Sequence, residues 1–240
     1  MTSSGALVMV LHSVPSWGWR CHTVHIEVYR EGRTFKQVAD IHFAAGKRFE
    51  QMVAVRVMPA TAEMWPRLGH AFGPREKDPA SCWCQRFLRH DDLENRTALR
   101  REVQEADVPI GLLAFLDDNV VGWTRVVRRS TLPRITENSA LARILDDDPD
   151  AWWVSCFVVR REYRGNGIGG ALLDAAVDWA VQHGASVLDG HPVDTQGLTG
   201  HGSPSALFTG TLAMFKRAGF TEIGRTYPTR PVMRYKFTQH

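Results

Sequence analysis

Apolar and polar positions follow a regular order from about residue 52 to the end of the 240-residue chain. Apolar or alternating runs predict strands over 52–57, 110–116, 120–128, 152–159 and 187–190, and one or two more over 225–237. Helical spacing of apolar positions predicts helices over 62–72, 96–107 and 167–183. This alternation favours one α/β domain.

Turn and capping residues mark several boundaries of these elements. The sequence Asp-Asp-Asn at 117–119 separates two predicted strands and indicates a hairpin in the sheet. Pro66 is expected to interrupt the first helix, and Asn95 has the side chain of an N-cap for the second.

The third predicted helix has the clearest apolar face. Ile168, Leu172, Ala175 and Trp179 lie at i, i+4, i+7 and i+11, which predicts one side of the helix against the sheet. Gly184 follows as a C-terminal stop.

The first 51 residues depart from this pattern. Alternation over 24–30 and 35–43, around residues 31–34, is compatible with a hairpin. A poorly ordered extension is the alternative. We therefore divide the chain into an N-terminal extension, 1–51, and a main domain, 52–240, and assign no chemistry to the extension.

Composition narrows the range of partners and compartments. With 44% hydrophobic and 23% charged residues, the chain can bury a sizeable core. A net charge of +3, with acids and bases interspersed, gives no reason to expect nucleic acid as a partner. The apolar segment 6–11 is too short to span a membrane, and no basic region precedes it. The cysteines have no disulfide-framework spacing, so we expect a cytoplasmic protein; a homodimer stays open.

The segment 164–170, Arg-Gly-Asn-Gly-Ile-Gly-Gly, lies between a predicted strand and a predicted helix. Its glycines remove side chains where backbone N–H groups must approach an anion. The following helix adds unpaired donors and the positive end of its dipole. The segment therefore predicts a phosphate or pyrophosphate site.

Three kinds of phosphate loop are candidates for this segment. A nucleotide-hydrolysing loop ends in Gly-Lys-Ser or Gly-Lys-Thr, and Ile168-Gly169-Gly170 stands here instead. A dinucleotide fingerprint is met in its bare form, with Asp189 near the acidic position, but it lies two thirds along the chain rather than in a first βα unit. The third candidate is the Arg-x-x-Gly-x-Gly signature.

Around this signature the chain resembles the GNAT family of acetyl-CoA-dependent N-acetyltransferases. Residues 157–173 resemble the family's fourth strand, pyrophosphate loop and third helix. Residues 213–220, which end in Gly-Phe, resemble its C-terminal helix. The resemblance implies an α/β fold of the α+β type: a mixed, mostly antiparallel sheet flanked by helices and splayed between its fourth and fifth strands.

The same resemblance implies the reaction and the cofactor. We expect an acyltransferase that passes the acetyl group of acetyl-CoA to an amine of a small molecule by direct attack in a ternary complex. The alternative is a non-catalytic acyl-CoA-binding sensor or interaction module. The implied cofactor-binding residues are Phe157, Val158, Val159, Arg164, Gly165, Asn166, Gly167, Ile168, Gly169 and Gly170. The Phe157 backbone N–H is also the expected oxyanion donor.

Two departures from the family leave the catalytic acid open. Phe215 stands where the family often has a tyrosine acid, and Phe208 where it often has a cofactor-contacting asparagine. We name Asp189, His191 and Tyr227 as catalytic candidates. A dedicated acid is dispensable if the thiol of coenzyme A, with a reference pKa near 8.5, leaves unaided.

Two further groups of residues have a functional and a structural interpretation. Cys82-x-Cys84 suggests a metal, with Cys156 or His90 as further ligands, but zinc sites normally show Cys-x-x-Cys and four clear ligands, so we expect no metal. The acidic run 146–150 is a solvated face or a surface that attracts a cationic amine.

Overall fold

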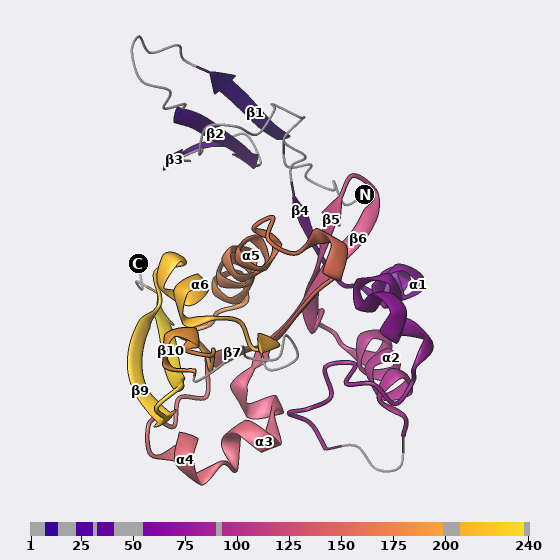
Figure 1. The fold of residues 1–240 in the computed structure, drawn as a ribbon, viewed down its shortest axis with the longest axis vertical. Coiled ribbons are helices and arrows are strands. Elements are labelled where there is room, and N and C mark those ends of the chain that lie inside the picture. The colour runs from indigo at the N-terminus through magenta and orange to yellow at the C-terminus, as the bar shows by residue number, and fades with distance from the viewer. Residues whose placement is uncertain are drawn as a thin grey trace. The chain divides into compact units, whose positions relative to one another are not determined.

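The structure is a computed structural model that describes residues 8–13, 23–30, 33–40, 55–89, 93–198 and 207–237. The chain divides into two compact units, Met1–Met52 and Val53–His240 (Figure 1).

The first unit contains a three-stranded antiparallel sheet in the order β1-β2-β3. Its strands are β1 (Val8–Ser13), β2 (Thr23–Arg30) and β3 (Arg33–Asp40). β2 and β3 pair from Thr23 with Asp40 to Arg30 with Arg33, over the segments for which alternation suggested a hairpin. Residues 31–32 and 41–43 of that interpretation lie outside the described part of the chain.

The second unit is built on a seven-stranded sheet in the order β4-β5-β6-β7-β8-β10-β9. The strands are β4 (Arg56–Pro59), β5 (Gly111–Leu116), β6 (Asn119–Arg128), β7 (Ala151–Val159), β8 (Val187–Gly190), β9 (Thr221–Tyr227) and β10 (Arg230–Lys236). Neighbours are antiparallel except β7 and β8, which run parallel. This is the predicted mixed, mostly antiparallel sheet.

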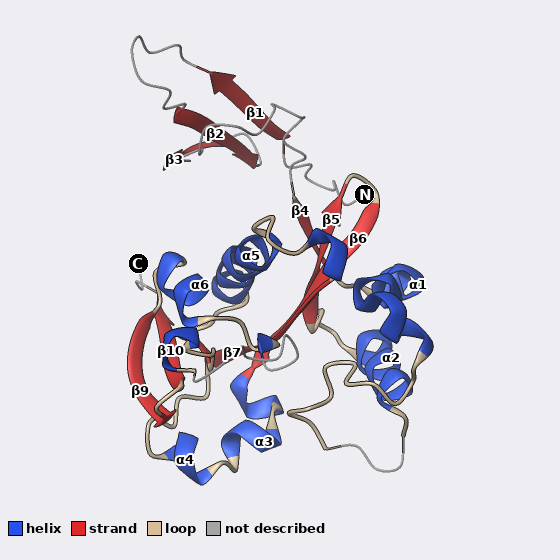
Figure 2. Ribbon diagram, in the orientation of Figure 1, coloured by secondary structure: helices blue, strands red, loops and turns tan. Residues whose placement is uncertain are grey.

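Helices cover both faces of this sheet (Figure 2). They are α1 (Trp65–Leu68), α2 (Asn95–Glu105), α3 (Pro133–Thr136), α4 (Ser139–Ala142), α5 (Ile168–Gln182) and α6 (Leu212–Arg217). Side chains alternate along β5, so Leu112 and Ala114 join the core under α5 and α6, whereas Leu113 and Phe115 join the core under α1 and α2. The fold class implied by the sequence is confirmed.

α5 turns a slightly different face to the sheet from the one predicted. Its buried side chains are Ile168, Leu172, Leu173, Ala176 and Ala180. The predicted members Ala175 and Trp179 are only partly buried and pack beside this stripe. The buried stripe is rotated by about one residue from the predicted positions 168, 172, 175 and 179. An apolar face this wide also includes the positions next to the predicted ones.

Two local predictions in the first half of the domain were wrong in detail. Pro66 does not interrupt a helix: it lies in the first turn of α1, where its missing N–H removes no intrahelical bond. Asn95 is the first residue of α2 rather than its cap, and its side-chain amide donates to the carbonyls of Ala80 and Ser81.

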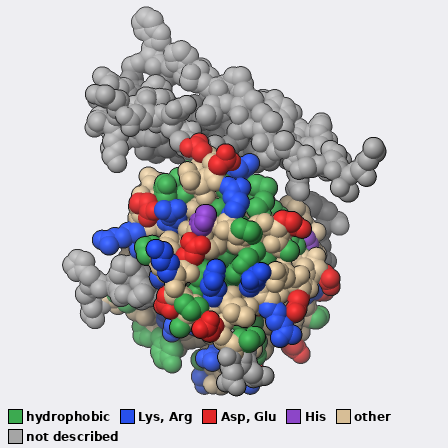
Figure 3. Space-filling model, turned by 90° about the vertical axis from the view of Figure 1, so that its right-hand side faces the viewer, with side chains coloured by type: hydrophobic (Ala, Val, Ile, Leu, Met, Phe, Trp, Pro, Cys, Tyr) green, Lys and Arg blue, Asp and Glu red, His purple; other side chains and the backbone are tan. Residues whose placement is uncertain are grey.

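Charged side chains of both signs are interspersed on the face drawn in Figure 3, with apolar groups between them. Within the described residues, none of the helices has both the length and the apolar character needed to cross a bilayer.

Candidate active site

The sheet opens between β7 and β8. The parallel ladder joins Ala151–Val154 to Val187–Gly190 and stops there, while β7 continues to Val159. Ser155 has no partner in the β6 register, so it forms a β-bulge at the same level and adds local twist. The predicted splay between the fourth and fifth strands of the main sheet is therefore present.

The segment before α6 lies along the open half of β7. The backbone N–H of Phe157 donates to the carbonyl of Phe208 at 2.6 Å. We expected this N–H to contact the pantetheine arm and to bind the oxyanion. In the structure this N–H is already paired, so a ligand that bonded to it would displace the Phe208 carbonyl.

The other two expected strand residues differ in orientation. Val158 pairs with Trp123 of β6, and its side chain is in the core under α2. The carbonyl of Val159 accepts a hydrogen bond from Nε of Arg164 at 3.1 Å. The guanidinium of Arg164 is thus tied to the end of β7.

The glycine loop turns from this strand into α5. Gly165 and Gly167 have φ of +82° and +75°, which glycine adopts without strain. Asn166 helps to hold the turn, since its side-chain amide donates to the carbonyl of Tyr163 at 3.1 Å. The residues from Arg164 to Gly167 are exposed, whereas Ile168 is buried in the core.

The first turn of α5 offers free space over unpaired backbone donors. Gly167 is its N-cap and has no side chain to satisfy the first N–H groups. A Cβ at Gly169 would touch Sδ of Met214 at 3.2 Å, but a Cβ at Gly170 would meet nothing within 4 Å. Neither packing nor a positive φ requires glycine at 170, so its small size leaves this helix end open to an anion.

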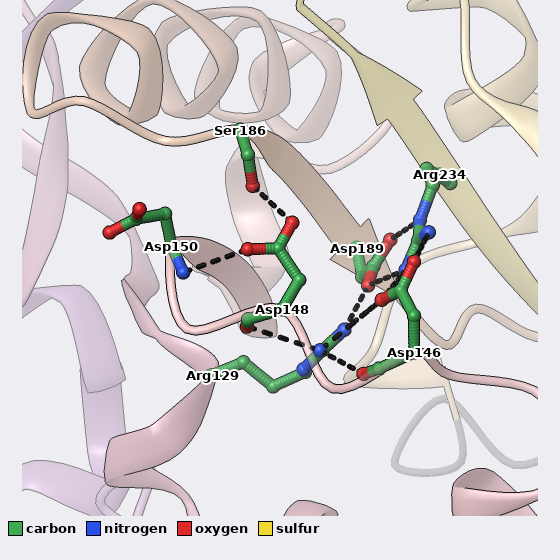
Figure 4. Close-up of polar contacts among 7 residues, drawn as sticks. All are labelled: Arg129, Asp146, Asp148, Asp150, Ser186, Asp189 and Arg234. Atoms are coloured by element: carbon green, nitrogen blue, oxygen red, sulfur yellow. Dashed lines mark hydrogen bonds and ion pairs between the residues drawn. The ribbon is translucent and has the colours of Figure 1, made fainter.

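Asp189 is fully buried between two arginines, one on each side of β8 (Figure 4). Arg129 donates to Oδ2 at 2.8 Å. Arg234 donates to Oδ1 at 2.7 Å and to Oδ2 at 2.8 Å. Both carboxylate oxygens are therefore engaged, an arrangement that favours a structural role over proton transfer.

The acidic run 146–150 supplies the other side of this ion-pair network. Asp146 accepts from Arg234 and Arg129, and the hydrogen bond with Arg234 is the main cause of its lowered pKa. Asp148 accepts from the hydroxyl of Ser186 at 2.5 Å. These carboxylates anchor the loop before β7 to β8 and β10, which speaks against the amine-attracting surface considered above.

His191 follows β8 directly and is half-buried. Its Nδ1 lies 3.4 Å from a guanidinium nitrogen of Arg230, which can only donate, so the ring hydrogen is on Nε2. Nε2 then donates to Oγ1 of Thr226 at 2.7 Å. Burial and, after it, the charge of Arg230 lower the pKa of His191 to about 4. The imidazole is neutral at neutral pH, and its lone pair faces a cation.

Tyr227 and Phe215 lie in contrasting surroundings. Tyr227 ends β9 and is 67% exposed. Phe215 of α6 is fully buried, with its ring edge-to-face against Phe157. A Cβ on Gly190 would come within 2.4 Å of the Phe215 ring, so the ring fills the space over that glycine. The position where the family often has an acid is part of the core here.

Two arginines that the sequence reasoning missed contact Phe208 and Thr209, in the segment that lies along the open half of β7. Arg230 donates to Oγ1 of Thr209 at 3.1 Å. The guanidinium of Arg86 lies 5.0 Å from the centre of the Phe208 ring. No motif marks either arginine, because Arg86 comes from a loop and Arg230 from the first position of β10, far apart in the sequence. The available signal was the position of Arg230 after the turn of the last hairpin.

The cysteines near this region are thiols in the core. Cys84 and Cys156 are buried, and Cys84 Sγ accepts a hydrogen bond from Nε1 of Trp123 at 3.0 Å. The hydrogen bond with Cys84 is the first cause of the raised pKa of Cys156. His90 lies outside the described residues. Across the part of the chain that the structure describes, no three His, Cys, Asp or Glu side chains group as metal ligands.

Comparison with known proteins gives the family. The family model described as "Acetyltransferase (GNAT) family" matches residues 75–195, half of the chain. Similar solved structures include the GNAT domain of PAT from S. lividans, at 17% identity and a TM-score of 0.47, covering 76% of this chain and 90% of that one. Another is yncA from Salmonella typhimurium with its cofactor acetyl-CoA, at 17% identity and a TM-score of 0.47, covering 78% and 96%. A third is diaminobutyrate acetyltransferase EctA from Paenibacillus lautus, at 15% identity and a TM-score of 0.44, covering 78% and 99%. A search of curated proteins gave no match. Because the family model matches half of the chain, the chain belongs to the GNAT family of acetyltransferases.

Proposed function

We propose that the protein transfers the acetyl group of acetyl-CoA to the amine of a small molecule. One observation carries the proposal: the exposed glycine loop and the open first turn of α5 come soon after the half of β7 that has no pairing with β8. An anion bound at the helix start and an extended arm beside β7 would then belong to one ligand.

The residues present fit the two ends of such a ligand. The backbone N–H groups of residues 165–170 would hold the pyrophosphate, with the exposed Arg164 adding charge at the rim. Phe157 and Val159 face the opening through their backbone, where the amides of a pantetheine arm pair as a strand would. The Phe208 carbonyl now bonded to Phe157 is the group that must yield.

When bound, acetyl-CoA supplies an activated acyl group and a thiol leaving group whose reference pKa is near 8.5. The described residues offer no strong base among our three candidates. Asp189 has both oxygens engaged, His191 is a weak base with a pKa of about 4, and Tyr227 lies on the surface. We therefore propose that the protein acts by orientation, with water accepting the amine proton.

The second candidate function is a module that binds acyl-CoA without turnover. Its support is Phe215, because a buried phenyl ring cannot protonate the leaving thiolate.

Calorimetric titration with acetyl-CoA, followed by thiol release across a panel of amines, tests the proposal. We expect acetyl-CoA to bind, NADH as control not to bind, and at least one amine to release thiol. Binding without release for any amine would favour the module. If acetyl-CoA does not bind, the interpretation of the glycine loop is wrong.

A further inference from the structure

A group of side chains around Arg230 lies next to the proposed acyl-transfer site. Arg230 begins β10 and is half-buried. One terminal nitrogen donates to Thr209 at 3.1 Å, and the other lies 3.4 Å from Nδ1 of His191. Neither partner carries a negative charge, because the Thr209 hydroxyl is uncharged and the His191 ring is neutral.

The surroundings of this cation therefore differ from those of the three buried arginines. Arg125, Arg129 and Arg234 are buried, and each pairs with a carboxylate. Within the described ranges, Arg230 has no carboxylate within ion-pair distance. Burial, and next the like charge of Arg86, lower the pKa of Arg230. Partial desolvation of a cation is costly without a counter-charge, so the group is suited to an anionic ligand.

Direct contacts connect this group to the open half of β7. Arg230 donates to Thr209, and Thr209 follows Phe208, whose carbonyl accepts from the N–H of Phe157. Arg86 lies over the ring of the same Phe208. Two guanidinium groups thus approach one short segment beside the strand where the thioester would lie.

His191 holds Arg230 in place from two sides. Its Nδ1 faces the guanidinium, and Nε2 lies 3.3 Å from the Arg230 carbonyl and 2.7 Å from Thr226 on β9. A neutral ring with a fixed tautomer orients the arginine without cancelling its charge. His191 is a positioning residue in this arrangement.

We infer that the acceptor carries an anionic group, a carboxylate or a phosphate, in addition to its amine. Arg230 binds this anion, and the exposed Arg86 supplies a second guanidinium. The inference rests on the proposed function, because it assigns the acceptor of that same site. A guanidinium binds either anion through paired N–H donors. The acceptor class is then amino acids or aminoalkyl phosphates rather than polyamines or uncharged amines.

The test compares matched amines in the thiol-release assay. The panel contains amino acids, their carboxamides, their decarboxylated amines and aminoalkyl phosphates. We expect kcat/KM to be about 10-fold or more higher for the best anionic amine than for its uncharged counterpart, the least that one charge-assisted contact gives. Equal or better use of the uncharged or cationic amines would overturn the inference. The carboxylate and phosphate arms identify which anion is bound.

Variants separate Arg230 from general charge effects. Arg230→Gln is expected to raise KM for the anionic acceptor about 10- to 100-fold and to leave the uncharged amines and acetyl-CoA affinity unchanged. Arg101→Gln is the control, since Arg101 is 65% exposed and pairs along α2 with Glu105. If Arg230→Gln weakens acetyl-CoA binding instead, Arg230 serves the cofactor and the inference fails.

A binding measurement keeps the two proposals apart if no amine releases thiol. The protein is titrated, with and without coenzyme A, with N-acetylated amino acids and N-acetylated aminoalkyl phosphates. The matching N-acetylated carboxamides are titrated in the same way. Tighter binding of the anions, lost in Arg230→Gln and kept in Arg101→Gln, supports the anion site even if turnover is absent. Equal affinity for anions and carboxamides refutes it.

Discussion

The carboxylate of Asp189 receives three hydrogen bonds from the guanidinium groups of Arg129 and Arg234 inside the protein. We expect Asp189→Asn to lower the free energy of unfolding by about 3–5 kcal/mol, because the two buried cations lose their buried carboxylate and keep Asp146, whose side chain is 54% exposed. Urea denaturation measures this. The control is Asp150→Asn, since Asp150 and Arg128 are 60% and 46% exposed and such a pair contributes about 0–1 kcal/mol. A loss at Asp189 no larger than the control would show that the network does not hold β8 and β10.

His191 gives the stability of the protein a defined dependence on pH. Its pKa is about 4 in the folded state, below the ordinary 6.5, so the folded state binds fewer protons than the unfolded state in that interval. Stability from this residue is present above pH 6.5 and is lost as the pH falls towards 4, by up to about 3 kcal/mol.

The measurement is the difference in unfolding free energy between wild type and His191→Gln across this range. Glutamine keeps a donor near Nε2 but does not titrate. The difference should shrink or change sign as the pH falls from 6.5 to 4. A constant difference would mean that the folded protein accepts the proton on His191 easily.

At the scale of elements, a negative charge in the first turn of α5 should affect stability and ligand binding in opposite directions. Gly170 is the third residue of the helix and has open space around it. Gly170→Glu places a negative charge where the helix dipole favours it, by about 0.3–1 kcal/mol, so the melting temperature should hold or rise. The same charge repels a pyrophosphate, so acetyl-CoA affinity should fall, most strongly at low salt.

Gly170→Gln is the matched control, because it has the same size without the charge. Calorimetric titration of both variants at two salt concentrations separates the two effects. Equal losses that do not depend on salt would indicate crowding. Unchanged acetyl-CoA affinity in both variants would show that the phosphates do not bind at this end of α5.

The elements also show why sequence patterns reached some features and not others. β7, the glycine loop and α5 are contiguous, so apolar periodicity and glycine spacing predicted them together. Asp189 and Arg129 are 60 residues apart, and no local pattern records that they meet. An acidic residue near the end of a short strand has the same local sequence whether a cleft or two arginines face it. The contact between Phe208 and Phe157, and the role of Arg230, are hidden for the same reason.

At the scale of the whole molecule, the described residues of the second unit form a sheet and a hydrophobic core of their own. Its seven strands lie within Val53–His240, and the hydrophobic clusters found among the described residues consist of residues of that unit. Val55 and Val57, near its start, pack against the core under α5. A chain lacking residues 1–52 should therefore keep β4 and the whole core.

We expect this shortened chain to unfold in one cooperative transition, with a free energy of unfolding within about 1 kcal/mol of that measured for the same transition in the full chain. Acetyl-CoA affinity should agree within about two-fold, because the glycine loop and β7 belong entirely to the second unit. Denaturation and calorimetric titration of both chains provide the comparison, and a chain starting instead at residue 58 is the control. That chain loses Val55 and Val57 and part of β4, so it should be measurably less stable. If removal of residues 1–52 lowers stability or acetyl-CoA affinity as much as removal of residues 1–57 does, the first unit takes part in the fold or the site of the second.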